Sequence, residues 1–120
     1  MGNRHELGPV GTNVLFENSK VKVWELVLDP GESSSWHHHT WDYITVGLMD
    51  SVIDRELIDG TKDRTTPALG VFRYADGHEP HRVTNVGDKQ HRNLLIEIKE
   101  ARLDITGKIS LTLVMLIDKA

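Results

Sequence analysis

The 120-residue chain contains no cysteine, which excludes disulfide bonds, thiolate metal ligands and cysteine nucleophiles. No apolar run approaches the roughly 20 residues of a membrane-spanning helix, and the N-terminus lacks the apolar region of a secretory signal. Basic clusters are missing as well, because 14 Lys and Arg residues are outnumbered by 18 Asp and Glu residues. We therefore expect a cytoplasmic protein that binds neither nucleic acid nor a membrane.

A long amphipathic helical pattern is also absent. Short segments rich in β-branched and aromatic residues recur about every ten residues and are separated by turn sequences such as Asp-Pro-Gly and Asp-Gly. This pattern predicts an all-β sandwich or barrel. Strands are expected at residues 14–17, 20–28, 51–58, 71–75, 81–86 and 93–99, and a histidine-rich strand is expected to run into 43–48.

The length fits one domain. Residues 1–13 are glycine-rich and without periodicity, and they are expected to form an N-terminal arm before a single barrel domain at 14–120. A last strand at about 109–117 exceeds what one small barrel needs. Its apolar stripe predicts a homodimer, because a bare apolar edge strand would aggregate; the stripe consists of Ile109, Leu111, Leu113, Met115 and Ile117.

Three consecutive histidines in the stretch 31–43 are the most informative feature of the chain. Side chains at i and i+2 share one face of a strand, so His37 and His39 should point together and His38 away. Two such imidazoles can converge on one metal ion, with His81 as the best third ligand. An exposed polar run is the alternative. A purification tag would lie at a terminus instead of between two tryptophans.

The spacing of these residues resembles the cupin family. Gly31, His37 and His39 match its first motif, while Tyr43 stands where the family usually has a ligand glutamate. The second motif is matched in register by Gly70, His81 and Asn85. The resemblance covers about residues 14–99 and implies a double-stranded β-helix, a jelly-roll-like barrel. The strings at 14–18, 23–25, 30–32 and 96–99 further resemble small bacterial cupins associated with β-alanine degradation.

Loss of the motif glutamate leaves a neutral three-histidine ligand set, with Tyr43 or Asp42 as possible fourth ligands. Strand alternation from His39 places Tyr43 inward and Asp42 outward. Because tyrosine is a poorer ligand than a carboxylate, we expect Tyr43 near the metal but not bound to it. Tyr43 and His78 are the candidate catalytic groups, although the loop sequence around His78 favours a position at the surface.

Arg55 and Arg73 lie in the middle of expected strands and could hold a substrate carboxylate through paired N–H groups. The alternative is a salt bridge at the rim. Trp36 and Trp41 could wall a substrate pocket or simply belong to the core, and Trp41 is taken as a candidate substrate contact. His91 is expected to face solvent.

These features favour an enzyme with one divalent transition metal (Fe, Mn, Ni or Zn) that acts on a small carboxylate as an oxygenase, isomerase or lyase. The alternative is a barrel that binds or senses a small molecule without turnover.

Overall fold

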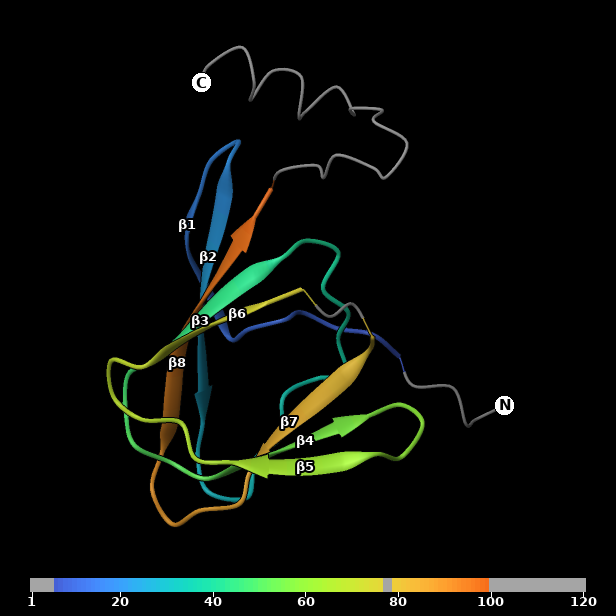
Figure 1. Ribbon diagram of the computed structural model, residues 1–120, viewed down its shortest axis with the longest axis vertical. Coiled ribbons are helices and arrows are strands. Elements are labelled where there is room, and N and C mark those ends of the chain that lie inside the picture. Colours follow the sequence, from blue (N-terminus) through green and yellow to red (C-terminus); the bar gives the residue numbers. More distant parts are fainter. Residues whose placement is uncertain (1–5, 77–78, 100–120) are drawn as a thin grey trace.

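The computed structural model describes residues 6–76 and 79–99, and this part of the chain is all-β (Figure 1). These residues form no helix, and therefore no helix that is long and apolar enough to cross a membrane. The expected strand at 109–117 and residue His78 lie outside the described residues.

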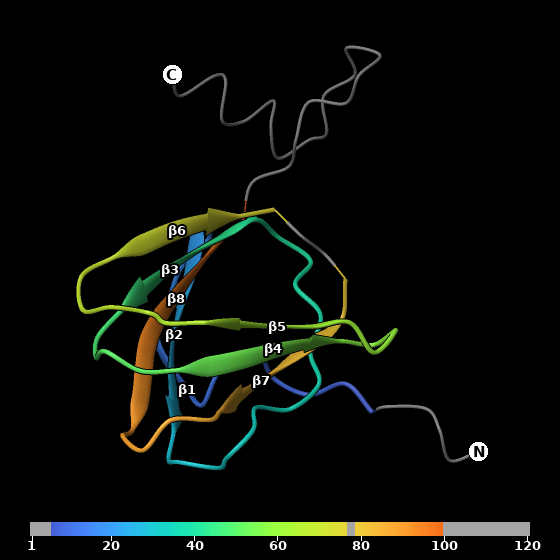
Figure 2. The same cartoon turned by 60° about the horizontal axis from the view of Figure 1, so that its bottom comes forward.

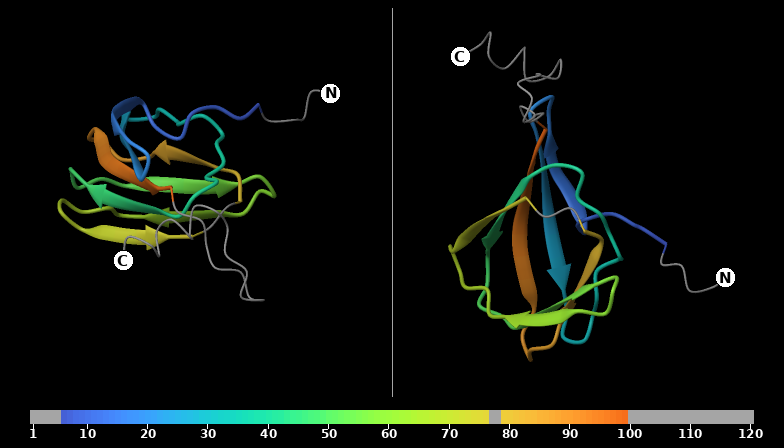
Figure 3. Two further views of the ribbon diagram at one scale, coloured as in Figure 1. Left: turned by 90° about the horizontal axis from the view of Figure 1, so that it is seen from above. Right: turned by 45° about the vertical axis from the view of Figure 1, so that its right-hand side comes forward.

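Two antiparallel sheets make up the barrel (Figures 1 and 2). The larger sheet has five strands in the order β1-β2-β8-β3-β6 and the smaller has three in the order β5-β4-β7. The right-hand view of Figure 3 shows the two sheets curving around a common interior. The strand bounds of the larger sheet are β1 Asn13–Glu17, β2 Val21–Leu28, β3 Tyr43–Gly47, β6 Phe72–Ala75 and β8 His91–Ile98; those of the smaller are β4 Ile53–Leu57, β5 Lys62–Thr65 and β7 His81–Asn85.

The turn signals in the sequence fall where the chain reverses. Asp29-Pro-Gly31 ends β2 with a Glu32 N–H to Asp29 carbonyl bond of 2.9 Å, and Gly31 has a φ of +86°. Asp59-Gly60 joins β4 to β5, with Gly60 at φ +95°. Both glycines adopt the left-handed conformation that disfavours other residues. This hairpin pairs the polar segment 62–65 with β4, so a strand forms where the composition alone predicted only a polar stretch.

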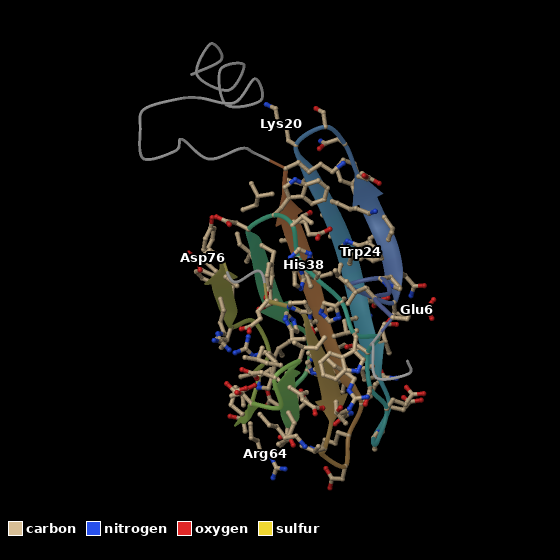
Figure 4. All side chains as sticks on the ribbon, turned by 90° about the vertical axis from the view of Figure 1, so that its right-hand side faces the viewer. Glu6, Lys20, Trp24, His38, Arg64 and Asp76 are labelled. Carbon is tan, nitrogen blue, oxygen red and sulfur yellow. The ribbon has the colours of Figure 1, made fainter. Side chains whose placement is uncertain are left out.

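The histidine-rich segment is not the regular strand that was expected. Between β2 and β3 the chain makes only isolated bridges to β7, at Ser33–Thr84 and His37–His81. Proline, glycine and three successive serines give this segment little strand propensity. It is nevertheless extended enough to alternate: His37 and His39 are buried and His38, labelled in Figure 4, is exposed.

The interior of the barrel is unusually polar. Two small apolar clusters, one of Val10, Tyr43 and Leu95 and one of Leu26, Leu28 and Val83, form its hydrophobic part. The largest side chains buried to less than 2% exposure are instead polar: His37, His39, His91 and Asn85. Buried polar groups are costly unless they are satisfied, so an interior of this composition points to a binding function.

Candidate metal centre

Backbone pairing between two distant segments brings the three predicted ligands together. The His37 N–H donates to the His81 carbonyl and the His81 N–H to the His37 carbonyl, each at 2.9 Å. This bridge fixes His37 beside the first residue of β7. His39, two residues further along the same extended segment, faces the same way and completes the group.

The three imidazoles converge. Their ligand nitrogens all lie within 4.8 Å of one another, and the Nε2 atoms of His37 and His81 are 3.1 Å apart. Ring centroids are separated by 5.0 Å for His37–His39, 4.4 Å for His37–His81 and 5.2 Å for His39–His81. All three side chains are buried, at 1–4% exposure.

An oxygen atom faces the Nδ1 atom of each ring. His37 Nδ1 lies 2.7 Å from the Ser35 carbonyl, and His81 Nδ1 lies 3.2 Å from the Glu79 carbonyl. His39 Nδ1 faces a carboxylate oxygen of Glu97 at 3.7 Å. Because carbonyl oxygens only accept hydrogen bonds, His37 and His81 must carry their proton on Nδ1, which leaves their Nε2 lone pairs directed at each other.

The surroundings also keep these rings neutral. Burial lowers the pKa of His37 to about 3, and the neighbouring His81 contributes to the shift. Burial likewise lowers the pKa of His81 to about 4, against the opposing effect of the bond to the Glu79 carbonyl. Two buried lone pairs at 3.1 Å repel each other unless a cation lies between them.

The spacing fits a metal ion. Nitrogens that each lie roughly 2.0–2.1 Å from one ion are about 2.9 Å apart at a right angle and about 3.3 Å apart at a tetrahedral angle. The observed 3.1 Å separation of the His37 and His81 Nε2 atoms falls between these values. A donor set of three imidazoles, each with an oxygen near its Nδ1 atom, is typical of transition-metal sites.

Tyr43 and Asp42 take the sides that strand alternation predicted. The Tyr43 ring is buried and stacks on His39, with centroids 3.8 Å apart and planes at 19°. Burial raises the pKa of the Tyr43 hydroxyl, although the charges of Arg55 and Arg73 partly oppose the shift. Asp42 accepts a hydrogen bond from the Tyr74 hydroxyl and is not part of the histidine cluster found among residues 6–76 and 79–99.

Sequence reasoning missed Glu97 and misplaced His91. Glu97, only 4% exposed, pairs across the sheet with Tyr43 and lies behind His39. His91 was expected to face solvent, but it is 1% exposed, with Nδ1 2.7 Å from the Ser51 hydroxyl and Nε2 2.6 Å from Asn93 Oδ1. The missed signal was the alternation of β8, which turns its polar residues inward.

Comparison of the sequence with protein-family models gives no match, and neither does comparison with curated proteins. Solved structures do match. A cupin domain from Bordetella pertussis Tohama I is 27% identical with a TM-score of 0.65, covering 77% of this chain and 99% of that one. An RmlC-like cupin with a double-stranded β-helix fold from Methanocaldococcus jannaschii is 14% identical with a TM-score of 0.60, covering 82% and 92%.

The fold is that of a cupin. The same fold is found in the polyketide cyclase RemF from Streptomyces resistomycificus, at 19% identity and a TM-score of 0.52, covering 81% of this chain and 63% of that one. In the cupin barrel described here, Asn85 is fully buried and its amide donates to the carbonyls of Leu28 and Lys89. Asn85 therefore has a structural role in joining the end of β2 to the turn after β7.

A cavity of about 440 Å³ lies inside the cupin barrel, with the three histidines in its wall. Arg55 and Arg73, one from each sheet, also line it, as does Asp63, whose carboxylate is 3.5 Å from Arg55 Nε. The Arg55 side chain is 44% exposed, so it lies where the cavity meets solvent. The volume of the cavity suits a small molecule.

The tryptophans beside the histidines lie elsewhere. Trp41 packs beneath the Lys99 ammonium, 5.6 Å from the ring centroid, and Trp36 packs beneath the Arg82 guanidinium at 4.9 Å. Within the described part of the chain, neither ring is among the side chains that line the cavity. The two tryptophans therefore flank the histidine segment without walling the cavity.

Proposed function

We propose that this cupin is a metal-dependent enzyme that acts on a small carboxylate, as an oxygenase, isomerase or lyase. The proposal depends most on one observation: two neutral, buried histidines direct their Nε2 lone pairs at each other, 3.1 Å apart, beside a third histidine. Such an arrangement is stable when a cation is shared among the rings. His37, His39 and His81 are the proposed ligands of one divalent ion.

Three imidazoles bind Fe, Mn, Ni or Zn, and the order of divalent affinities together with metal supply decides which is bound. When bound, such an ion supplies Lewis acidity and open positions for oxygen ligands. The protein contributes a buried cavity that limits the access of water and rings already oriented by their Nδ1 contacts.

Arg55 and Arg73 support a carboxylate substrate. Both residues line the same cavity as the three histidines, and their positive charges oppose part of the rise in the pKa of Tyr43. We propose that they hold the substrate carboxylate while Tyr43 directs its hydroxyl at the substrate. The raised pKa of Tyr43 keeps this hydroxyl protonated at neutral pH, where it can donate a hydrogen bond or a proton.

His78 remains a second candidate acid or base. The resemblance to cupins of β-alanine degradation directs the search for substrates toward short amino and keto acids. The alternative function is a module that binds the same carboxylates without turnover, because a cavity, two arginines and a metal also suffice for sensing.

Turnover on protein of known metal content tests this proposal. Chelator-stripped protein is reloaded separately with Fe²⁺, Mn²⁺, Ni²⁺ or Zn²⁺ and incubated with small carboxylates, with and without dioxygen, and products are followed by mass spectrometry. We expect conversion that requires one of the metals, is lost in His81→Ala and is retained in His38→Ala. Saturable carboxylate binding without any conversion would favour the sensing module.

We also propose that the protein is a homodimer. The outward face of the five-stranded sheet carries an apolar row that crosses all of its strands: Phe16, Val23, Ile96, Ile44 and Tyr74. A second apolar row runs through Leu94, Val46 and Phe72. Faces of this extent favour burial against a second copy of the chain. A cytoplasmic location and the absence of nucleic-acid or membrane partners stay predictions from composition.

A further inference from the structure

Glu97 is buried in the barrel wall and both of its carboxylate oxygens have directed contacts. Oε1 accepts a hydrogen bond from the Trp24 indole Nε1 at 2.8 Å, and Oε2 faces His39 Nδ1 at 3.7 Å. Figure 4 labels Trp24 on β2, the strand next to β8. Burial of an ionised carboxylate is costly unless the group is paired or hydrogen-bonded. A carboxylate kept here therefore calls for a role beyond filling space.

The three histidines differ in what faces their Nδ1 atoms. Neutral backbone carbonyls face His37 and His81, whereas a carboxylate faces His39. A carboxylate behind a metal-binding imidazole fixes the Nδ1–H tautomer and makes the opposite nitrogen a stronger donor, and such partners typically change metal affinity ten- to hundredfold. Glu97 also supplies negative charge near an ion whose proposed ligands are all neutral.

We infer that Glu97 is a positioning residue for the metal centre, an inference that rests on the metal site of the proposed function. It holds His39 with its Nε2 lone pair toward the ion, and Trp24 holds Glu97. The competing interpretation is a purely structural one, in which Glu97 only satisfies the buried indole N–H of Trp24.

Because Glu97 also contacts Trp24, the substitution Glu97→Gln distinguishes a positioning role from a purely structural one. The Trp24 indole needs an acceptor, so the new amide must turn its oxygen to Trp24 and its NH₂ group to His39 Nδ1. That NH₂ group favours the wrong tautomer, with the His39 proton on Nε2, where it blocks metal binding. In the double variant Glu97→Gln/Trp24→Phe there is no indole N–H that needs an acceptor. The amide oxygen of Gln is then able to face His39 Nδ1.

The probe is Zn²⁺, with its affinity measured by competition with a chromophoric chelator, supported by the absorption bands of bound Co²⁺. We expect Glu97→Gln to weaken Zn²⁺ binding ten- to hundredfold and to shift the Co²⁺ bands. Glu97→Asp should retain more affinity than Glu97→Gln, and adding Trp24→Phe to Glu97→Gln should restore part of the loss. Glu25→Gln is the matched control. It removes a charge from the same sheet, where Glu25 pairs with Arg92, and it should change Zn²⁺ affinity less than about twofold.

Melting of each metal-free variant shows whether the barrel still folds. Zn²⁺ affinity that is unchanged in Glu97→Gln, or lowered no more than in Glu25→Gln, would overturn the inference while leaving the three-histidine site intact. Further loss in the double variant would equally contradict it, because a structural role predicts that two core substitutions are worse than one. If the wild-type protein binds no Zn²⁺ or Co²⁺, both this inference and the proposed function are wrong.

Discussion

Strand β8 turns a mostly polar face toward the barrel interior and a mostly apolar face outward, which is the reverse of an ordinary barrel strand. Its inward positions hold His91, Asn93, Leu95 and Glu97, three of them polar and all at most 7% exposed. Its outward positions hold Leu94, Ile96 and Ile98 after Arg92, all only half-buried. A strand with one buried face normally places its apolar residues inside.

This inversion separates two tasks. The inner face supplies polar groups to the cavity and to the histidine cluster, and these groups have specific partners such as Ser51 for His91 and Trp24 for Glu97. The outer face supplies apolar area. We therefore expect inner substitutions to change metal and ligand binding, and outer substitutions to change assembly.

The largest effect should come from the metal ligands on the inner side. Replacing His37, His39 or His81 singly by alanine should reduce Zn²⁺ affinity far beyond the ten- to hundredfold typical of outer-shell partners. His38→Ala is the matched control, because its side chain is exposed beside two buried ligands. Metal analysis and chelator competition measure this. Equal losses for His38 and His37 would contradict the inward-facing geometry.

Acidification should act strongly on the same face. His37 and His81 have folded-state pKa values of about 3 and about 4, below the ordinary value of 6.5. Between these values and 6.5 the unfolded chain binds more protons, so the metal-free protein should lose stability as pH falls from 6.5 toward 4. Because both rings stay neutral in the folded protein until the pH nears these values, protons should displace the metal only there. The melting temperatures of loaded and metal-free protein should therefore differ at pH 7.5 and converge only near about pH 4.

Thermal melts of loaded and metal-free protein from about pH 7.5 to 3.5 test this. Coincident curves at every pH would show that metal does not stabilise the fold. Convergence already near about pH 6 would show that the histidines titrate close to their ordinary value and would contradict a buried, neutral pair of His37 and His81.

On the outer face, Phe72→Lys should convert the dimer to a monomer without reducing metal content. Phe72 is 68% exposed and lies in an apolar row of the sheet, where a lysine charge would have to be buried at the interface. Leu69→Lys is the control, because Leu69 is equally exposed at 68% but lies in the turn before β6. Sedimentation at micromolar concentration distinguishes these outcomes. A wild-type monomer would refute the dimer.

The smallest effect is expected for the arginines at the cavity. Arg55→Gln and Arg73→Gln should each weaken carboxylate binding by about 1 kcal/mol, roughly fivefold, because each removes a charge partner that is exposed to solvent. Isothermal titration with a carboxylate identified in the turnover screen measures this. The control is Arg64→Gln, because neither Arg64 nor its partner Asp54 lines the cavity. Unchanged affinity in both variants would exclude the arginines from the substrate site.

The sequence predicted the cluster of three histidines better than its surroundings. His37 and His39 could be found from their two-residue spacing, and His81 from a second histidine cluster beside a strand, because these signals are local. Glu97 could not be found this way. The string Leu-Leu-Ile-Glu-Ile at 94–98 predicts that its apolar residues face the core, and only the pairing of Tyr43 with Glu97 shows the reverse. His91 was misplaced for the same reason.

The β-fold itself was predictable, since turns and strand-like runs alternate along the chain, and most strand positions are confirmed to within two residues. The prediction that the histidine segment forms a regular strand was wrong. Strand propensity depends on residue types and does not show which backbone groups pair with the segment. Its shape comes from single bridges to β7, 44 residues away in the case of His37 and His81. Long-range pairing of this kind has no local signature.

The central claim is that three neutral histidines hold one metal ion. Equilibrium titration of chelator-stripped protein with Zn²⁺, using competition to fix the affinity, tests it most directly. We predict one ion per chain in the wild-type protein and in His38→Ala, and none of comparable affinity in His37→Ala. A wild-type chain that binds no ion, or one whose binding survives His37→Ala unchanged, would contradict the claim.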